Sequence, residues 1–240
     1  VRLTDNFVHL NNVPPLEKTS GIVTFNEKGV WAPNLTALTY GKAISGSIST
    51  DEEGKISILA SGVVDAKTVS KIIDSPASTS LLDFIQGETN ANVRVDIHHG
   101  ISIFVNSSLT GTYTNLPPPF KKSVESVWPL IFELQPCEKD QNCRARMKLS
   151  VADQLLKIGI LYGNDQRGLK ATRGFLSIDS KQATMPDNDG LSLYLNAKSL
   201  AWNDWEDVIN HALKQTQTDP NGDLKKMNLN QIVANVTHFD

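Results

Sequence analysis

Two cysteines in a polar segment are the residues best suited to covalent chemistry. Cys137 and Cys143 flank a loop in the stretch QPCEKDQNCRAR, six positions apart. Such a pair can form a disulfide that joins the two ends of a hairpin, which fits an oxidising compartment. The alternative is a pair of free thiols in a loop of a cytosolic protein. A zinc site is the weaker interpretation, because no histidine or further cysteine lies near in sequence to complete four ligands.

The histidines do not suggest a metal site. His98 and His99 are adjacent, at a break between two strand-like segments. Adjacent strand residues point to opposite faces, so this pair is poorly placed to chelate one ion, and a surface turn is the better interpretation. The segments MPDNDGL and QTDPNGDLKKMN lack the carboxylates that an EF-hand needs at its first and twelfth positions. Both are predicted to be Asp/Asn-Gly turns.

No familiar catalytic motif is present in the sequence. It contains no G-x-S-x-G elbow, no H-E-x-x-H, no P-loop and no G-x-G-x-x-G. The acidic residues fall mainly in turns and on polar strand faces, and no pair stands out as a catalytic dyad. We therefore expect no enzymatic activity, no cofactor and no metal. The N-x-S/T triplets at Asn34, Asn106 and Asn235 are weak signals in a chain rich in these residue types.

Composition places the chain among soluble globular proteins. It has 240 residues, of which 40% are hydrophobic and 20% charged. The formal charge of -3 leaves no broad basic field for nucleic acid. No apolar run approaches the roughly 20 residues that a transmembrane helix needs. The N-terminus begins with Val and lacks the features of a signal peptide, so we expect a piece of a longer protein.

Alternation of apolar and polar residues is the dominant structural signal. It is clearest in ANVRVDIHHGISIFVNSS, GKISILASG and GLSLYLNAK, where each segment is expected to have one apolar and one polar face. Short polar turns such as NEKG and DEEGK separate most segments, which favours antiparallel pairing. A few helices are predicted, over residues 63–74, 78–87, 120–128 and 202–216. Asn203 is the expected N-cap of the last helix, with Glu206 three residues on.

Three longer segments carry ordered motifs. Residues 13–48 contain a Pro-Leu approach, a strand, a turn and a Gly-rich return strand. Residues 106–130 contain a strand of the form S-x-L-x-G, then L-P-x-P, then a Lys-bearing segment that ends in P-L. Residues 173–209 contain R-G, a proline, G-L, a strand and a tryptophan that opens a helix. The residues at these places are Pro15, Leu16, Gly21, Phe25, Gly29, Leu35, Gly41, Ser108, Leu109, Gly111, Leu116, Pro117, Pro119, Lys122, Pro129, Leu130, Arg173, Gly174, Pro186, Gly190, Leu191 and Trp205.

These motifs resemble those of the AsmA-like proteins of the YhdP type, over most of the chain and in the same order. The insertion that holds Cys137 and Cys143 is a departure from the family's pattern. The resemblance implies a curved antiparallel sheet that forms an open groove, apolar inside and polar outside. It also implies a periplasmic section of a protein anchored in the inner membrane of Gram-negative bacteria. Its ligand would be phospholipid on its way to the outer membrane, with other envelope proteins as further partners.

The sequence thus predicts a mainly β fold with a few short helices, as one section over residues 1–240. Within it, we expect sub-blocks at 1–75, a strand repeat plus a helix, and at 76–240, the groove sheet with a helix near 203–216. A non-catalytic lipid conduit is the favoured function. A β-sandwich binding or scaffold module of the envelope is the alternative, and a hydrolase is the weakest hypothesis. The residues expected to line the groove are Val93, Val95, Ile97, Ile101, Ile103, Val105, Leu191, Leu193 and Leu195.

Overall fold

One large β-sheet dominates the molecule. The computed structural model describes residues 1–9, 14–73, 82–137, 143–165, 168–200, 202–216 and 229–239. The helices are α1 (Ala66–Ile73) and α3 (Trp202–Thr216). The strands are β1 (Arg2–Val8), β2 (Leu16–Ile22), β3 (Thr24–Asn26), β4 (Gly29–Thr39), β5 (Lys42–Thr50), β6 (Ile56–Asp65), β7 (Ile85–Ile97), β8 (Ile101–Ser107), β9 (Thr112–Thr114), β10 (Leu130–Pro136), β11 (Ala145–Val151), β12 (Leu156–Asp165), β13 (Gly168–Ile178), β14 (Gly190–Leu200) and β15 (Leu229–Phe239).

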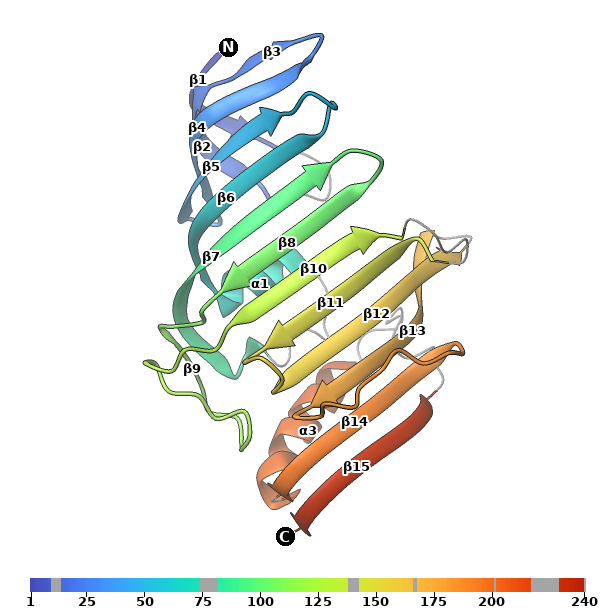
Figure 1. Cartoon of the computed structure of the whole chain (residues 1–240). Helices are drawn as coiled ribbons and strands as arrows, with labels where there is room; N and C mark the ends of the chain where they lie inside the picture. The colour runs from blue at the N-terminus through green and yellow to red at the C-terminus, as the bar shows by residue number, and fades with distance from the viewer. Residues whose placement is uncertain are drawn as a thin grey trace.

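The sheet is open and follows the chain almost in sequence order. Its 15 strands run β1-β2-β4-β5-β6-β7-β8-β10-β11-β12-β13-β14-β15, with β3 paired to β4 and β9 to β7. The strands at the two ends, β1 and β15, do not pair with each other, so the sheet is not closed into a barrel (Figure 1). Figure 1 also shows that the sheet is twisted and that β7 bends near its start. The expected mainly β fold with an open, curved sheet is confirmed.

Parallel pairing at the C-terminal end differs from the sequence-based expectation. Every ladder from β1 to β13 is antiparallel, whereas β13–β14 and β14–β15 are parallel. The reason is the length of the connections: residues 179–189 join β13 to β14, and α3 lies between β14 and β15. Such crossovers return the chain to the starting edge, so the next strand runs in the same direction. The PDNDG segment, predicted as a tight turn, belongs to the first crossover.

One of the predicted helices is wrong, and a second is predicted to extend too far. Residues 120–128 form no helix, and Lys122 instead pairs with Thr114 in an isolated bridge. In the helix predicted over residues 78–87, Leu82 is helical, but the last three residues belong to β7, which begins at Ile85 and pairs with β9. Residues 78–81 of that prediction lie outside the described residues. In both places, β-type pairing with another segment replaces a local helical pattern.

The other two helices are present: α3 has the predicted bounds, whereas α1 starts later than predicted. α1 begins at Ala66, because β6 extends to Asp65. α3 already includes Trp202, so Asn203 is a helical residue and not the predicted N-cap. Helix boundaries are the least reliable part of a sequence-based assignment, because the apolar period does not mark where the first turn begins.

Two glycines allow β9 to return along the start of β7. Gly87 and Gly111 have φ of +89° and +91°, values that residues other than glycine rarely adopt. A Cβ on Gly87 would lie 2.2 Å from the Gly111 carbonyl oxygen, and one on Gly111 would lie 2.4 Å from the Glu88 carbonyl oxygen. The glycine of the S-x-L-x-G motif therefore permits a close approach of two backbones.

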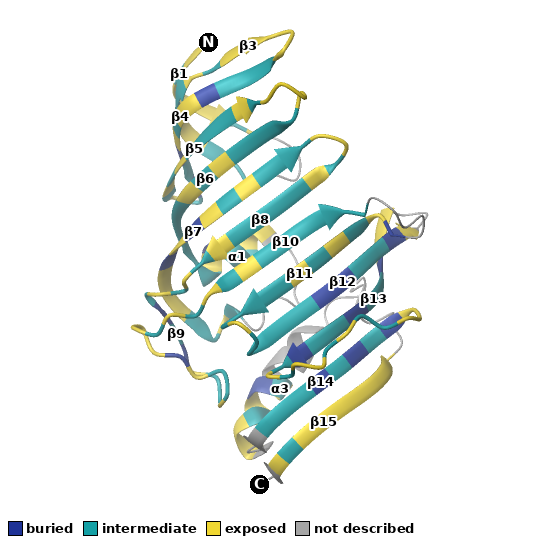
Figure 2. Ribbon diagram, in the orientation of Figure 1, coloured by how far each residue is buried: buried dark blue, intermediate teal, exposed yellow. Residues whose placement is uncertain are grey.

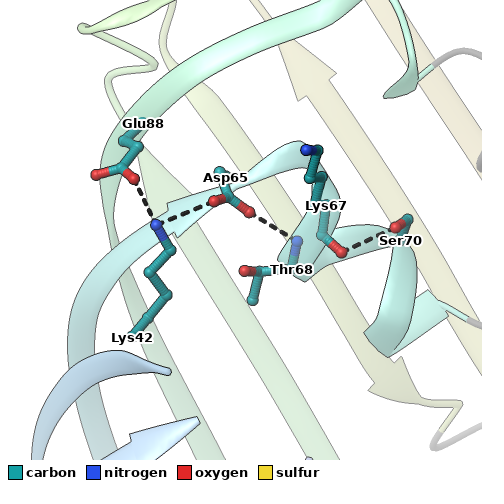
Figure 3. A network of polar contacts seen from close by, with 6 residues as sticks. All are labelled: Lys42, Asp65, Lys67, Thr68, Ser70 and Glu88. Atoms are coloured by element: carbon teal, nitrogen blue, oxygen red, sulfur yellow. Dashed lines mark hydrogen bonds and ion pairs between the residues drawn. The ribbon is translucent and has the colours of Figure 1, made fainter. Parts of the chain in front are cut away.

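A polar cluster fixes the junction between β6 and α1. Asp65 is the N-cap of α1, and its Oδ1 accepts a hydrogen bond of 2.7 Å from the backbone N–H of Thr68 (Figure 3). The Lys42 Nζ lies 3.0 Å from the Asp65 Oδ2 and also donates to Glu88. The hydrogen bond from Thr68, with help from Lys42, lowers the pKa of Asp65 to about 2, and burial only partly opposes this effect. The cluster thus joins β5, β6, α1 and β7.

The charge of Asp65 should stabilise the fold in a pH-dependent way. Its folded pKa, about 2, lies below the ordinary value of 3.8, so the stabilisation is present above the ordinary pKa and is lost as the pH falls towards 2. Asp65→Asn keeps a capping acceptor and removes the charge. We expect it to lower the free energy of unfolding by about 1–2 kcal/mol at pH 7. Urea unfolding at several pH values checks this, and a difference that stayed constant down to pH 2 would contradict it.

Candidate functional site

One face of the sheet is predominantly apolar from β5 to β15. Residues paired across neighbouring strands project to the same side. A central row of such cross-strand partners runs across the sheet. The rows on either side of it are also mainly apolar. The central row is Gly46, Ala60, Val93, Val105, Phe132, Leu149, Ile158, Leu176, Leu193 and Ile232. The flanking rows are Ile48, Ile58, Val95, Ile103, Leu134, Met147, Ile160, Gly174 and Leu191, and Ile44, Gly62, Ala91, Ser107, Leu130, Val151, Leu156, Ile178, Leu195 and Ala234. We call this surface the apolar face.

The opposite side, the polar face, carries hydroxyl, amide and charged groups on the alternate residues. Neighbouring strands pair these groups with one another, and three of the contacts are typical. The Ser45 and Ser61 hydroxyl oxygens are 3.1 Å apart, the Asn92 amide donates to the Asn106 Oδ1 at 3.1 Å, and Arg94 lies 4.4 Å from the Phe104 ring centroid. Cross-strand pairs of this kind satisfy the polar face without a covering layer.

The apolar face is not sealed into a closed core in the described part of the chain. Most of its side chains are half-buried, as Figure 2 shows by the prevalence of intermediate colouring over the sheet. Ile101 at one end is 56% exposed, and Ile232 on β15 is 62% exposed. The described residues contain one sheet and not two stacked sheets. A β-sandwich would instead bury such a face against a second sheet about 10 Å away.

Both helices lie on the side of the apolar face. The crossover of residues 179–189 lies against the polar face: Ser177 Oγ donates to the Ser180 carbonyl at 3.1 Å, and Tyr194 Oη donates to the Thr184 carbonyl at 3.3 Å. Figure 1 draws this crossover in front of β13 and β14, and draws α1 and α3 behind the sheet. The helices therefore border the apolar face without forming a continuous layer over it.

The structure brings all nine predicted groove residues to the apolar face. Val93 pairs with Val105, Val95 with Ile103, and Ile97 with Ile101. Leu191, Leu193 and Leu195 lie on the same side, five strands further along. The predicted groove residues did not include any from the strands between them. Phe132, Leu149 and Ile158 complete the surface, and their own alternation was the signal that could have identified them.

A shallow depression of about 780 Å³ crosses the polar face between β4 and β10. Its walls include two rows of that face, one with Ser47, Leu59 and Arg94 and the other with Ser61 and Asn92. Arg94 is the charged residue among them, and its Nε lies 3.4 Å from the Asp96 Oδ2. The lining also includes Leu35, Phe104 and Ile131, so it is nearly neutral and mixes apolar with hydrogen-bonding groups.

A compact lobe of residues 108–129 connects β8 to β10. Lys122, from the Lys-bearing motif segment, is only 4% exposed, and its Nζ donates to the carbonyls of Thr112 at 2.7 Å and Ser123 at 3.1 Å. Burial lowers the pKa of Lys122, and the nearby Glu125 carboxylate opposes that effect. The motif lysine therefore holds the lobe together from inside, which is a structural role.

The structure joins Cys137 and Cys143 in a disulfide, with their Cα atoms 5.7 Å apart. The bond closes the connection from β10 to β11, next to the backbone hydrogen bond of 3.1 Å from Cys137 N–H to the Arg144 carbonyl. Residues 138–142 of that connection lie outside the described residues.

Removing this disulfide should lower stability moderately, because the loop that it closes is short. From the separation of six residues, the loss of chain entropy corresponds to about 2 kcal/mol. We expect a Cys137→Ser/Cys143→Ser variant to unfold at correspondingly lower urea concentration. Thiol titration of the unreduced wild type should find no free thiol, and two free thiols in protein from an oxidising compartment would contradict the bond.

A metal site and a membrane-spanning helix are both absent from the described part of the chain. No group of three or more His, Cys, Asp or Glu residues there could hold a metal ion. No helix there is long and apolar enough to cross a membrane. His98 and His99 are exposed in the turn between β7 and β8, as predicted.

These features define an open-sheet protein with one apolar and one polar face. The chain belongs to the YhdP protein family, whose model matches residues 1–239. No curated protein and no solved structure matches the chain. Family membership suggests a non-enzymatic cell-envelope protein of the lipid-transport type, with which the open sheet is compatible.

Proposed function

We propose that this chain shields the acyl chains of phospholipids on its apolar face, as a non-catalytic section of an envelope protein that moves lipid between the inner and outer membranes. The observation that carries the proposal is the predominantly apolar surface from β5 to β15, which has no second sheet over it in the described residues. The nine groove residues from Val93 to Leu195 would contact the lipid tails directly.

The physical chemistry of an acyl chain fits such a surface. Removing a methylene group from water contributes about 0.8 kcal/mol, and an open face shields only part of each group. Many weak contacts therefore hold a tail without any strong one. Successive rows of Val, Ile and Leu offer nearly equal positions, so a tail can shift from one row to the next at little cost. A headgroup can stay in water, because the sheet is open at the side.

The cellular setting is part of the same proposal. The section lies in the periplasm, its parent protein has an inner-membrane anchor, and other envelope proteins are its partners. The Cys137–Cys143 disulfide supports an oxidising compartment of this kind. The alternative, a sandwich-like binding module, needs a second sheet to cover the apolar face, and the described residues supply none.

Native mass spectrometry of the protein purified from cells, followed by lipid extraction, tests the proposal. We expect phospholipid to co-purify in amounts comparable to the protein. Protein that carries no lipid, and takes up none from vesicles of phosphatidylethanolamine and phosphatidylglycerol, would refute a lipid-shielding role.

A further inference from the structure

Two motif segments that are far apart in the sequence meet in the structure. The Trp205 indole N–H on α3 donates to the Pro118 carbonyl oxygen at 3.2 Å. The Trp205 and Phe120 rings meet edge to face, with centroids 5.9 Å apart and planes at 83°. Trp205 belongs to the motif that opens the last helix, and Pro118 and Phe120 belong to the proline motif of the lobe. We call these three residues the clasp.

The clasp bridges one rim of the sheet. The lobe follows the end of β8 and precedes the start of β10, whereas α3 follows the end of β14. At this rim β10 and β12 begin, and β11 and β13 end. Between β10 and β14 lie four strand spacings, roughly 19 Å along the sheet. Since α3 lies on the side of the apolar face, the contact passes across that side of the rim.

The residues at this rim are part of the apolar face. Its last row there contains Leu130, Val151, Leu156, Ile178 and Leu195. The opposite rim has the connections at residues 98–100 and 138–142, of which 98–100 is the exposed histidine turn. The described part of that rim has no helix bridging its strands. The clasp therefore bridges one rim of the sheet, whereas no helix bridges the described part of the opposite rim.

We propose that the clasp confines acyl chains on the apolar face by closing this rim, so that lipid leaves along the sheet or over the opposite rim. The inference rests on the proposed lipid-shielding function. Trp205 and Phe120 act as positioning residues for the strap and not as its main lipid contacts. The clasp consists of one hydrogen bond and one ring contact, both partly accessible to solvent, so it can open without unfolding the sheet.

The release rate of bound lipid tests the clasp. The full chain is loaded with phosphatidylglycerol that carries a pyrene-labelled tail, and transfer to excess acceptor vesicles is followed by fluorescence. Trp205→Ala and Phe120→Ala should each raise the release rate by about 5–10-fold, the factor expected for losing one or two weak contacts. Trp205→Phe keeps a ring but no indole N–H, and should give a smaller increase.

Trp31→Ala is the matched control, because the Trp31 indole N–H donates to the Thr50 carbonyl at 3.1 Å in the N-terminal part of the sheet, away from the clasp. It should leave the release rate unchanged. A second test joins Phe120→Cys to Trp205→Cys with a bismaleimide, in the Cys137→Ser/Cys143→Ser background, and should slow release. This linked variant answers the question even if the alanine variants fold poorly.

The outcomes separate the two proposals. If wild-type protein binds lipid, and the wild type, the alanine variants and the cross-linked variant all release it at the same rate, the clasp proposal is overturned. The proposed function then still stands. Wild-type protein that binds no lipid would overturn both. Faster release in Trp31→Ala than in Trp205→Ala would also count against the clasp, because it would indicate a general loosening of the sheet.

Discussion

Replacing Val105 by aspartate is expected to reduce bound phospholipid at least tenfold while the protein stays folded. Val105 lies in the central row of the apolar face, between Val93 on β7 and Phe132 on β10. An acyl chain bound over this position would desolvate the aspartate carboxylate. This costs several kcal/mol when no hydrogen-bond donor or cation replaces the water. Because the face is only half-buried, the carboxylate remains hydrated when no lipid is present, and the fold tolerates it.

The adjacent residue offers a matched control for this substitution. Asn106 lies on the same strand and projects from the polar face, where its Oδ1 accepts a hydrogen bond from the Asn92 amide. Asn106→Asp adds the same charge and keeps that acceptor. We expect normal lipid content for Asn106→Asp, measured by lipid extraction alongside Val105→Asp, with equal urea midpoints for both. Equal lipid loss in the two variants would indicate a general charge effect and would contradict a role for the apolar face.

Gly111→Ala should lower the free energy of unfolding by roughly 2 kcal/mol or more. The substitution combines two costs: a φ of +91° that an L-residue rarely adopts, and a Cβ placed 2.4 Å from the Glu88 carbonyl oxygen. The obstacle is backbone and not a flexible side chain, so β7 and β9 would have to separate. Urea unfolding measures the change, and loss of the β9 pairing should also increase hydrogen exchange at Gln86 and Tyr113, which face each other across the two strands.

Gly41→Ala separates the two costs. Gly41 has a φ of +80°, and nothing lies within 4 Å of a Cβ built there. Its substitution should therefore cost only the conformational part, about 1 kcal/mol. If Gly111→Ala were no more destabilising than Gly41→Ala, the close approach of β7 and β9 would not be a constraint on the fold.

The alternating strands were predictable from the sequence because an open sheet leaves one face in water. Val93 to Val105 and Leu191 to Leu195 have the simple period of two that such a sheet requires. β10 was missed, although Leu130, Phe132 and Leu134 alternate, because flanking prolines and a preceding helix-like segment obscured its start. Local pattern therefore identified the faces of the strands better than their limits.

The arrangement across strands was beyond local pattern. The row that connects Val105 with Phe132 and Leu149 depends on register, which two distant strands set together. The meeting of Trp205 with Pro118 depends on a crossover whose direction the sequence does not encode locally. The lobe around Lys122 has a local helical pattern in the sequence, although it forms no helix in the structure. There Lys122 pairs with Thr114 in an isolated bridge, a contact that local pattern does not encode.

Site-specific photo-crosslinking in cells tests whether phospholipid contacts the apolar face and not the polar face. A photoreactive amino acid is placed at Ile101 or Leu193 on the apolar face, and at Asn106 or Lys148 on the polar face, in the full-length protein. If the apolar face shields lipid, we expect phospholipid adducts at Ile101 and Leu193 and none at Asn106 and Lys148. Absence of lipid at both apolar positions, or equal capture on the two faces, would contradict it.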